Sequence, residues 1–92
     1  MPVTQDQIQR AVDVAKRYGA TRVILFGSAA THPETARDLD LAVAGVLGWE
    51  FFGMAAEMEQ AARIALDVVP LEPETRFIRY IRERGRVLYE GS

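Results

Sequence analysis

Cysteine is absent from the 92-residue sequence, and histidine occurs once, at His32. Without cysteine the chain can form no disulfide, no thiolate zinc site and no cysteine nucleophile. This composition fits a reducing compartment. The N-terminal MPVTQDQIQR has no basic region followed by an apolar core, so no signal peptide is predicted. We therefore expect a cytoplasmic protein.

Long apolar runs and an excess of basic charge are also missing. The longest apolar run, Leu41 to Trp49, is about half as long as a membrane span requires. The net charge of -2 at pH 7 provides no general attraction to nucleic acid or to an anionic membrane. We expect no membrane association and no direct nucleic-acid partner.

The composition that remains is typical of a soluble globular domain, with 49% hydrophobic and 26% charged residues. A chain of this length buries one modest core and has no room for a second lobe. Residues 1–92 are therefore predicted to form a single domain.

The hydrophobic pattern predicts helices alternating with short apolar strands. Thr4 and Gln7 have the spacing of a capping box, which predicts the start of the first helix. Gly19 is a suitable C-terminal stop for the same helix. Pro73 is suited to the first turn of the last helix. The order predicts an α/β (α+β) domain, a small mixed β-sheet with helices packed on it. The predicted elements are a helix over 5–18, a strand over 22–27, a helical turn and loop over 28–37, a strand over 38–45, a helix over 49–64, a strand over 64–71, a helix near 73–84 and a short RVLYE tail.

Two aspartates, Asp38 and Asp40, lie in the second predicted strand, within DLDLAV. Because side chains alternate along a strand, both aspartates point to one face, and their Cα atoms lie about 6.5–7 Å apart. Like charges at this spacing on a half-buried face repel each other. A divalent cation removes the repulsion, and Mg²⁺ is held by one or two carboxylates together with water and substrate phosphates. The alternative is a pair of solvated aspartates on an exposed edge.

A third carboxylate, Asp67, stands between apolar residues in ALDVVPL, where an unpaired charge is unfavourable. If the third predicted strand lies beside the second, Asp67 joins Asp38 and Asp40 on one face. Three such carboxylates can hold two metal ions about 3.5–4 Å apart. The alternative for Asp67 is a strand-end aspartate that accepts hydrogen bonds from a turn.

Gly27 and Ser28 end the first predicted strand. Glycine lets the backbone approach a ligand closely, and the turn that follows offers N–H groups and a hydroxyl to an anion. Alone, the pair is an ordinary strand-to-turn junction. One loop before the two aspartates, it predicts a phosphate site that faces a metal site.

Taken together, LFGSAA, RDLDLAV and LDVV resemble the glycine–serine, paired-aspartate and third-aspartate signature of the DNA-polymerase-beta-like nucleotidyltransferases. The size of the chain and its ending, FIRYIRERGRVLYEG, are similar to the minimal nucleotidyltransferase (MNT) branch. The resemblance covers nearly the whole chain and implies the nucleotidyltransferase fold. It implies that Gly27 and Ser28 bind the β- and γ-phosphates of the nucleotide. It also implies two Mg²⁺ ions and a set of catalytic metal ligands, Asp38, Asp40 and Asp67, of which the last activates the acceptor hydroxyl.

The sequence departs from this family in the turn. Family members often continue it as G-S-R-x-R-G, whereas Ala29, Thr31 and His32 stand at the arginine and final glycine positions. Two cations that reach the phosphates are therefore missing. Arg37 and the later arginines are candidates to replace them.

The resemblance further implies transfer of AMP from ATP to a hydroxyl, a tyrosine of a HEPN-domain toxin. The chain would then be the antitoxin of a toxin–antitoxin pair and part of a hetero-oligomer. Two alternatives are a weak or inactive MNT that neutralises its partner by binding alone, and nucleotidyl transfer to a small molecule such as an antibiotic. The presence of all three aspartates favours an active enzyme.

Other residues have simpler interpretations. His32 is predicted to be a solvated loop residue, and the alternative is a role near the phosphates. The aromatic and methionine side chains early in the second long helix are predicted to pack on the sheet, and the alternative is a surface that docks a partner. The arginines of the last helix are predicted to form a solvated face, and the alternative is a strip that binds an acidic partner or nucleotide phosphate. These two sets are Trp49, Phe51, Phe52 and Met54, and Arg76, Arg79, Arg82, Arg84 and Arg86.

Overall fold

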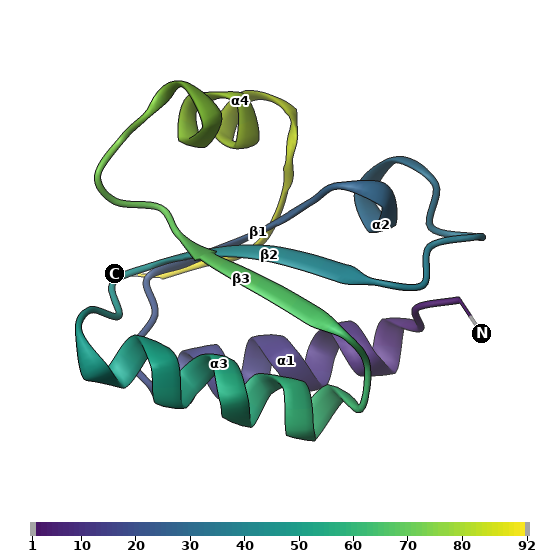
Figure 1. The fold of residues 1–92 in the computed structure, drawn as a ribbon, viewed down its shortest axis with the longest axis horizontal. Coiled ribbons are helices and arrows are strands. Elements are labelled where there is room, and N and C mark those ends of the chain that lie inside the picture. Colours follow the sequence, from purple (N-terminus) through teal and green to yellow (C-terminus); the bar gives the residue numbers. More distant parts are fainter. Residues whose placement is uncertain (1, 92) are drawn as a thin grey trace.

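The computed structural model describes residues 2–91 and shows a four-stranded mixed β-sheet with helices on both faces (Figure 1). Its elements are α1 (Gln5–Arg17), β1 (Arg22–Phe26), α2 (Ser28–Thr31), β2 (Leu39–Ala44), α3 (Trp49–Ala62), β3 (Leu66–Pro70), α4 (Arg76–Arg84) and β4 (Arg86–Glu90). The strand order is β3-β2-β1-β4, in which β2 and β3 are parallel and the other neighbours are antiparallel. The predicted α+β class with a small mixed sheet is confirmed.

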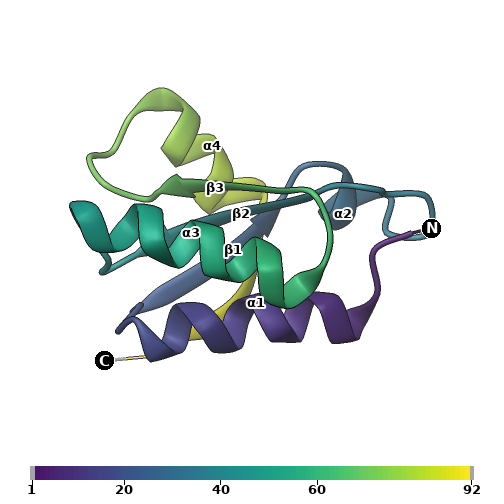
Figure 2. The same ribbon diagram turned by 60° about the horizontal axis from the view of Figure 1, so that its bottom comes forward.

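The larger core lies between the sheet and two helices, α1 and α3, which run side by side across one face (Figures 1 and 2). The predicted capping box fixes the start of α1: Thr4 Oγ1 accepts a hydrogen bond from Gln7 N at 3.1 Å, and Gln7 Oε1 accepts one from Thr4 N at 2.9 Å. Leu41 from β2 and Met58 from α3 are fully buried in this core. Each such side chain contributes about 1.5–3 kcal/mol when removed from water.

A smaller core lies on the opposite face of the sheet, under α4 (Figure 1). Ile78 and Ile81 of α4 pack there against Ile24 and Ala42 of the sheet and against Leu71. α4 has nine residues, and the end of β2 that carries Asp40 is only half-buried. This second face is therefore covered in part.

The C-terminal segment differs from the prediction. RVLYE, expected to be a short tail, is the strand β4, which pairs antiparallel with β1 at the edge of the sheet. Its residues are exposed or half-buried, so their pattern lacks the continuous apolar run of a central strand. Pairing with β1 stabilises it, since β1 supplies the hydrogen-bond partners.

The sequence predicted a last helix that starts near Pro73. In the structure this helix, α4, begins three residues later, at Arg76. Thr75 is its N-cap, and the Thr75 hydroxyl oxygen accepts a hydrogen bond from Ile78 N at 3.2 Å. A threonine that caps the first turn determines the boundary here more strongly than the preceding proline.

Two aromatic residues at the start of α3 do not pack on the sheet, and for them the prediction was wrong. Trp49 is 89% exposed and Phe52 is 68% exposed, whereas Phe51 is half-buried and Met54 is fully buried. Trp49 and Phe52 are three residues apart, so they share the helix face that points away from the core. With the neighbouring Leu47, 64% exposed, they form an exposed apolar cluster (Leu47, Trp49 and Phe52).

Among residues 2–91, none of the helices combines the length and the apolar character needed to cross a membrane.

Candidate active site

Two of the predicted carboxylates stand directly opposite each other in the sheet. In the parallel pairing of β2 with β3, Asp40 is the partner of Asp67. The flanking Leu39, Leu41 and Leu66 point into the larger core, so both carboxylates lie on the opposite face, the one that carries α4. The expected adjacency of these two strands is confirmed, and it brings together carboxylates that are 27 positions apart in the chain.

Gly27 stands against the first of these carboxylates. β1 ends at Phe26, which pairs with Asp40, and Gly27 follows with φ +74° and ψ -155°, a conformation that side chains disfavour. A Cβ atom built at this position would overlap Asp40 Oδ2. Glycine is therefore required here for two reasons, the backbone angle and the space that the carboxylate occupies.

Ser28 opens the short helix α2, which Gly27 caps at its N-terminus. The Gly27 carbonyl accepts hydrogen bonds from Ala30 N at 3.1 Å and from Thr31 N at 3.3 Å, which closes the turn. Ser28 is exposed, so its hydroxyl is accessible to a ligand. The structure thus places Gly27 of the predicted phosphate turn against Asp40, and Ser28 follows it at the start of α2.

Asp38 is less closely integrated. It lies in the bend before β2 and is exposed. Within residues 2–91, no three His, Cys, Asp or Glu side chains are arranged to hold a metal ion. The structure therefore brings together Asp40 and Asp67 and leaves Asp38 beside them, outside a formed set of three ligands.

The electrostatics of the site centre on Asp40. Partial burial raises the pKa of the Asp40 carboxyl above its ordinary value, and the negative charges of Asp67 and Asp38 and a hydrogen bond with Asp67 raise it further. The charged form of Asp40 is thus unfavourable without a cation nearby.

The departures in the turn now have positions in space. Ala29 is buried in the larger core, so its side chain faces away from the site. Thr31 is exposed, and its hydroxyl donates to the Gly27 carbonyl at 3.3 Å. His32 is exposed at the end of α2, as predicted.

A pocket of about 360 Å³ lies between α2 and α4, and Gly27 is one of its walls. This volume is within the range of small-molecule sites. The sequence singles out Arg84 only as one of several arginines, and no local signal selects the aromatic residues beside it. The lining residues are Phe26, Gly27, Ala30, Thr31, Phe77, Tyr80, Ile81, Arg84 and Gly85.

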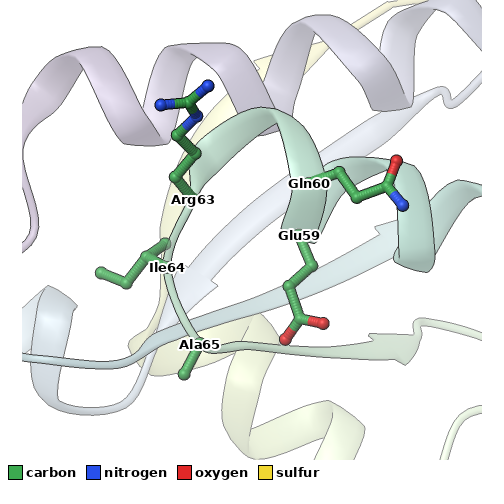
Figure 3. A pocket seen from close by; sticks show the side chains of 5 residues that line it. All are labelled: Glu59, Gln60, Arg63, Ile64 and Ala65. Atoms are coloured by element: carbon green, nitrogen blue, oxygen red, sulfur yellow. The ribbon is translucent and has the colours of Figure 1, made fainter.

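A more open hollow of about 500 Å³ lies at the end of α3, in the segment just before β3, and neither Asp40 nor Asp67 lines it (Figure 3). Figure 3 shows that its polar side chains diverge: Glu59 points toward the start of β3, and Arg63 points toward α1. Because a binding site needs polar groups that converge, this hollow is not the candidate site.

Comparisons with known proteins agree with this fold. No protein-family model and no curated protein sequence matches the chain. A solved structure of a protein described provisionally as a minimal nucleotidyltransferase is 25% identical, with a TM-score of 0.71 over 92% of this chain and 94% of that one. The crystal structure of the toxin–antitoxin MntA–HepT is 17% identical, with a TM-score of 0.70 over 95% of this chain and 73% of that one.

A toxin–antitoxin crystal structure with AMP-PNP is 16% identical, with a TM-score of 0.73 over 91% of this chain and 73% of that one. At 16% and 17% identity the likeness shows the fold. The chain therefore has the nucleotidyltransferase fold, and its predicted resemblance to the minimal nucleotidyltransferases is confirmed.

Proposed function

We propose that this protein is a Mg²⁺-dependent nucleotidyltransferase that transfers AMP from ATP to a tyrosine hydroxyl of a HEPN-domain toxin and so acts as its antitoxin. The observation that carries the proposal is the in-register pairing of Asp40 with Asp67 beside Gly27. Solved structures of similar fold support the partner and the nucleotide, because they are toxin–antitoxin structures and one is described with AMP-PNP.

The pair of carboxylates fits Mg²⁺. Mg²⁺ takes one or two carboxylates and fills its remaining positions with water and substrate phosphates. Asp40 and Asp67 supply the two, and the raised pKa of Asp40 supports this role, because a nearby cation favours the ionised form of a carboxyl. Asp38 remains the predicted third ligand. When bound, Mg²⁺ supplies positive charge to the phosphates as negative charge moves onto the leaving group.

The residues of the chain position and deprotonate the reactants. The turn at Gly27 and Ser28 holds the β- and γ-phosphates, so that pyrophosphate faces away from the acceptor. The acceptor oxygen forms a bond to the α-phosphorus, and the bond from that phosphorus to the bridging oxygen of pyrophosphate breaks. The hydroxyl proton passes to Asp67, whose exposure allows its release to solvent.

A protein acceptor is supported by the exposed apolar cluster. Contiguous apolar surface of this kind is typical of contacts with another protein. The cluster borders a groove of about 270 Å³ that Val46, Phe51 and Pro70 also line. We therefore propose that the toxin docks there. Replacing Trp49 and Phe52 together by serine should weaken toxin binding at least about 30-fold, as for interface residues worth about 2 kcal/mol or more.

The test of the transfer reaction combines the purified protein, the HEPN protein encoded beside its gene, ATP labelled at the α-phosphate, and Mg²⁺. Label is expected on the toxin, and Asp40→Asn or Asp67→Asn should abolish it. Asp13→Asn is the matched control, because this exposed aspartate lies on α1, outside the site. A toxin that binds tightly and stays unlabelled with every divalent cation would overturn the transfer reaction and favour neutralisation by binding alone.

A further inference from the structure

The turn that faces the phosphates contains no basic residue. From Gly27 to Thr31 the side chains are small or hydroxylated, while Asp40 and Asp67 beside them are acidic. A nucleoside triphosphate is strongly anionic, and proteins bind its oxygens most firmly with charged hydrogen-bond donors. A cation for the phosphates must therefore come from another element of the fold.

One cation faces this turn from across the pocket between α2 and α4. Of the residues that line the pocket, Arg84 is the one with a positive charge, and Thr31 and Gly27 line the same space. Thr31 occupies the position where the related sequences often carry the second arginine of the turn. Arg84 thus reaches, from α4, the space that an arginine at position 31 would share.

The backbone holds Arg84 at this place. β4 pairs antiparallel with β1 so that Arg86 is opposite Leu25, and the two residues before it, Arg84 and Gly85, line one pocket with Phe26 and Gly27. Gly85 packs closely on β1: an added Cβ atom would lie 3.0 Å from the Leu25 carbonyl oxygen and 2.6 Å from that of Ile81. A larger residue at position 85 would push the end of α4, and with it Arg84, away from the turn.

The guanidinium of Arg84 is also available for a ligand. Its Cζ atom lies 5.5 Å from the centre of the Tyr80 ring, a cation–π contact that orients the side chain. Within residues 2–91, Arg84 forms no ion pair, whereas Arg79 and Arg82 on the same helix both pair with Glu74 at 3.4 Å. Arg37 does not line the pocket.

We propose that Arg84 binds the β- and γ-phosphates of the nucleotide and replaces, from the other side of the pocket, the arginine absent at Thr31. The inference rests on the proposed function. A planar guanidinium suits the bidentate recognition of phosphate, and Tyr80 holds it in place. The turn itself has no basic residue, and Arg84, 57 positions after Gly27, supplies one from α4.

The test measures binding of three ligands to the whole protein with Mg²⁺ by titration calorimetry: AMP-PNP, inorganic tripolyphosphate and adenosine. Arg84→Gln should weaken AMP-PNP and tripolyphosphate about 10- to 100-fold, the effect of losing hydrogen bonds to a charged group. Adenosine binding should not change. Arg79→Gln, on the same helix but outside the pocket, should alter all three by less than about threefold. An unchanged urea midpoint for Arg84→Gln shows that the variant folds.

A swap of positions provides the second arm. Thr31→Arg combined with Arg84→Gln should recover most of the lost tripolyphosphate affinity. If the wild-type protein binds AMP-PNP and Arg84→Gln binds it equally well, Arg84 does not bind the phosphates. That result would overturn this inference and leave the proposed function standing. If Arg84→Gln loses equal affinity for AMP-PNP and for adenosine, the inference is overturned too. If the wild type binds no nucleotide, with or without its toxin, the proposed function itself fails.

Discussion

The two faces of the β-sheet are covered to different extents. Two helices of 13 and 14 residues, α1 and α3, cover one face and bury the larger core, while the nine residues of α4 cover the other face in part. The partly covered face carries Asp40, Asp67 and Gly27. A carboxylate pair cannot be enclosed in a core without a high desolvation cost, so the open part of the second face is where chemistry is possible.

This difference teaches that stability and function are divided between the faces. The larger core lies on the face of α1 and α3, whereas the carboxylate pair and the strained Gly27 lie on the other face, beside the smaller core. A binding site formed of like charges and a strained glycine lowers the stability of the free protein. The core on the face covered by α1 and α3, here called the closed face, has to offset this loss. Four changes test this division, from the largest expected effect to the smallest.

Truncation on the closed face should have the largest effect on stability. Leu41→Ala removes a fully buried side chain from the larger core and should lower the free energy of unfolding by about 2–5 kcal/mol. Ile81→Ala, in the smaller core under α4, should fall at the lower end of that range, because a less enclosed site relaxes more easily. Urea denaturation measures both. A larger loss from Ile81→Ala would contradict the comparison.

Gly27→Ala should have the next largest effect on stability. It should lower the free energy of unfolding by about 1–3 kcal/mol, because of backbone strain and the added overlap with Asp40. Gly48→Ala is the matched control: Gly48 also caps a helix N-terminus, with φ +65° and ψ -140°, and has open space where a Cβ would be. Gly48→Ala should reproduce the strain alone and leave AMP-PNP binding intact, whereas Gly27→Ala should lose it. Equal nucleotide binding by both variants would refute the role of Gly27.

Asp40→Asn should stabilise the protein, by less than the preceding variants destabilise it. Removing one charge of a half-buried carboxylate pair relieves repulsion, so the variant should unfold at a higher temperature than the wild type when no divalent cation is present. Added Mg²⁺ should stabilise the wild type and not the variant. Thermal unfolding with EDTA and with Mg²⁺ measures this. Destabilisation by Asp40→Asn in EDTA would show that Asp40 is structural.

The smallest effect concerns a polar contact between α1 and α3. Glu57 accepts hydrogen bonds from Arg17 Nη2 at 2.6 Å and from the Tyr18 hydroxyl at 2.9 Å. Both hydrogen bonds lower the pKa of Glu57, and the bond from Arg17 has the larger effect. Stability from a lowered carboxyl pKa is present above the unfolded-state value, about 4.3, and is lost as the pH falls through the folded-state value.

Glu57→Gln should therefore destabilise the protein slightly at pH 7, and the difference from wild type should shrink toward pH 3. Urea midpoints at the two pH values measure this. Glu83→Gln, an exposed change on α4 that removes the same charge, should show no such dependence. A Glu57→Gln difference that is constant with pH would contradict the assignment.

Much of the fold could be predicted because its signals are local. The capping box of Thr4 and Gln7, the apolar run of β1 and the alternation around Asp40 all act within a few residues, and the structure confirms the elements they predict. β4 could not be predicted in this way, because its stability comes from pairing with β1, more than 60 positions earlier. The exposure of Trp49 depended on which face of α3 meets the sheet.

The sequence by itself determined the order of the elements up to α4, the glycine–serine turn and the three aspartates with their family resemblance. Only the tertiary structure decided which of these residues meet. Parallel pairing of β2 with β3 set Asp40 opposite Asp67, and antiparallel pairing of β4 with β1 brought Arg84 to the pocket beside Gly27. The physical reason is that periodicity and capping act over one or two turns of chain, whereas strand register depends on packing between distant segments.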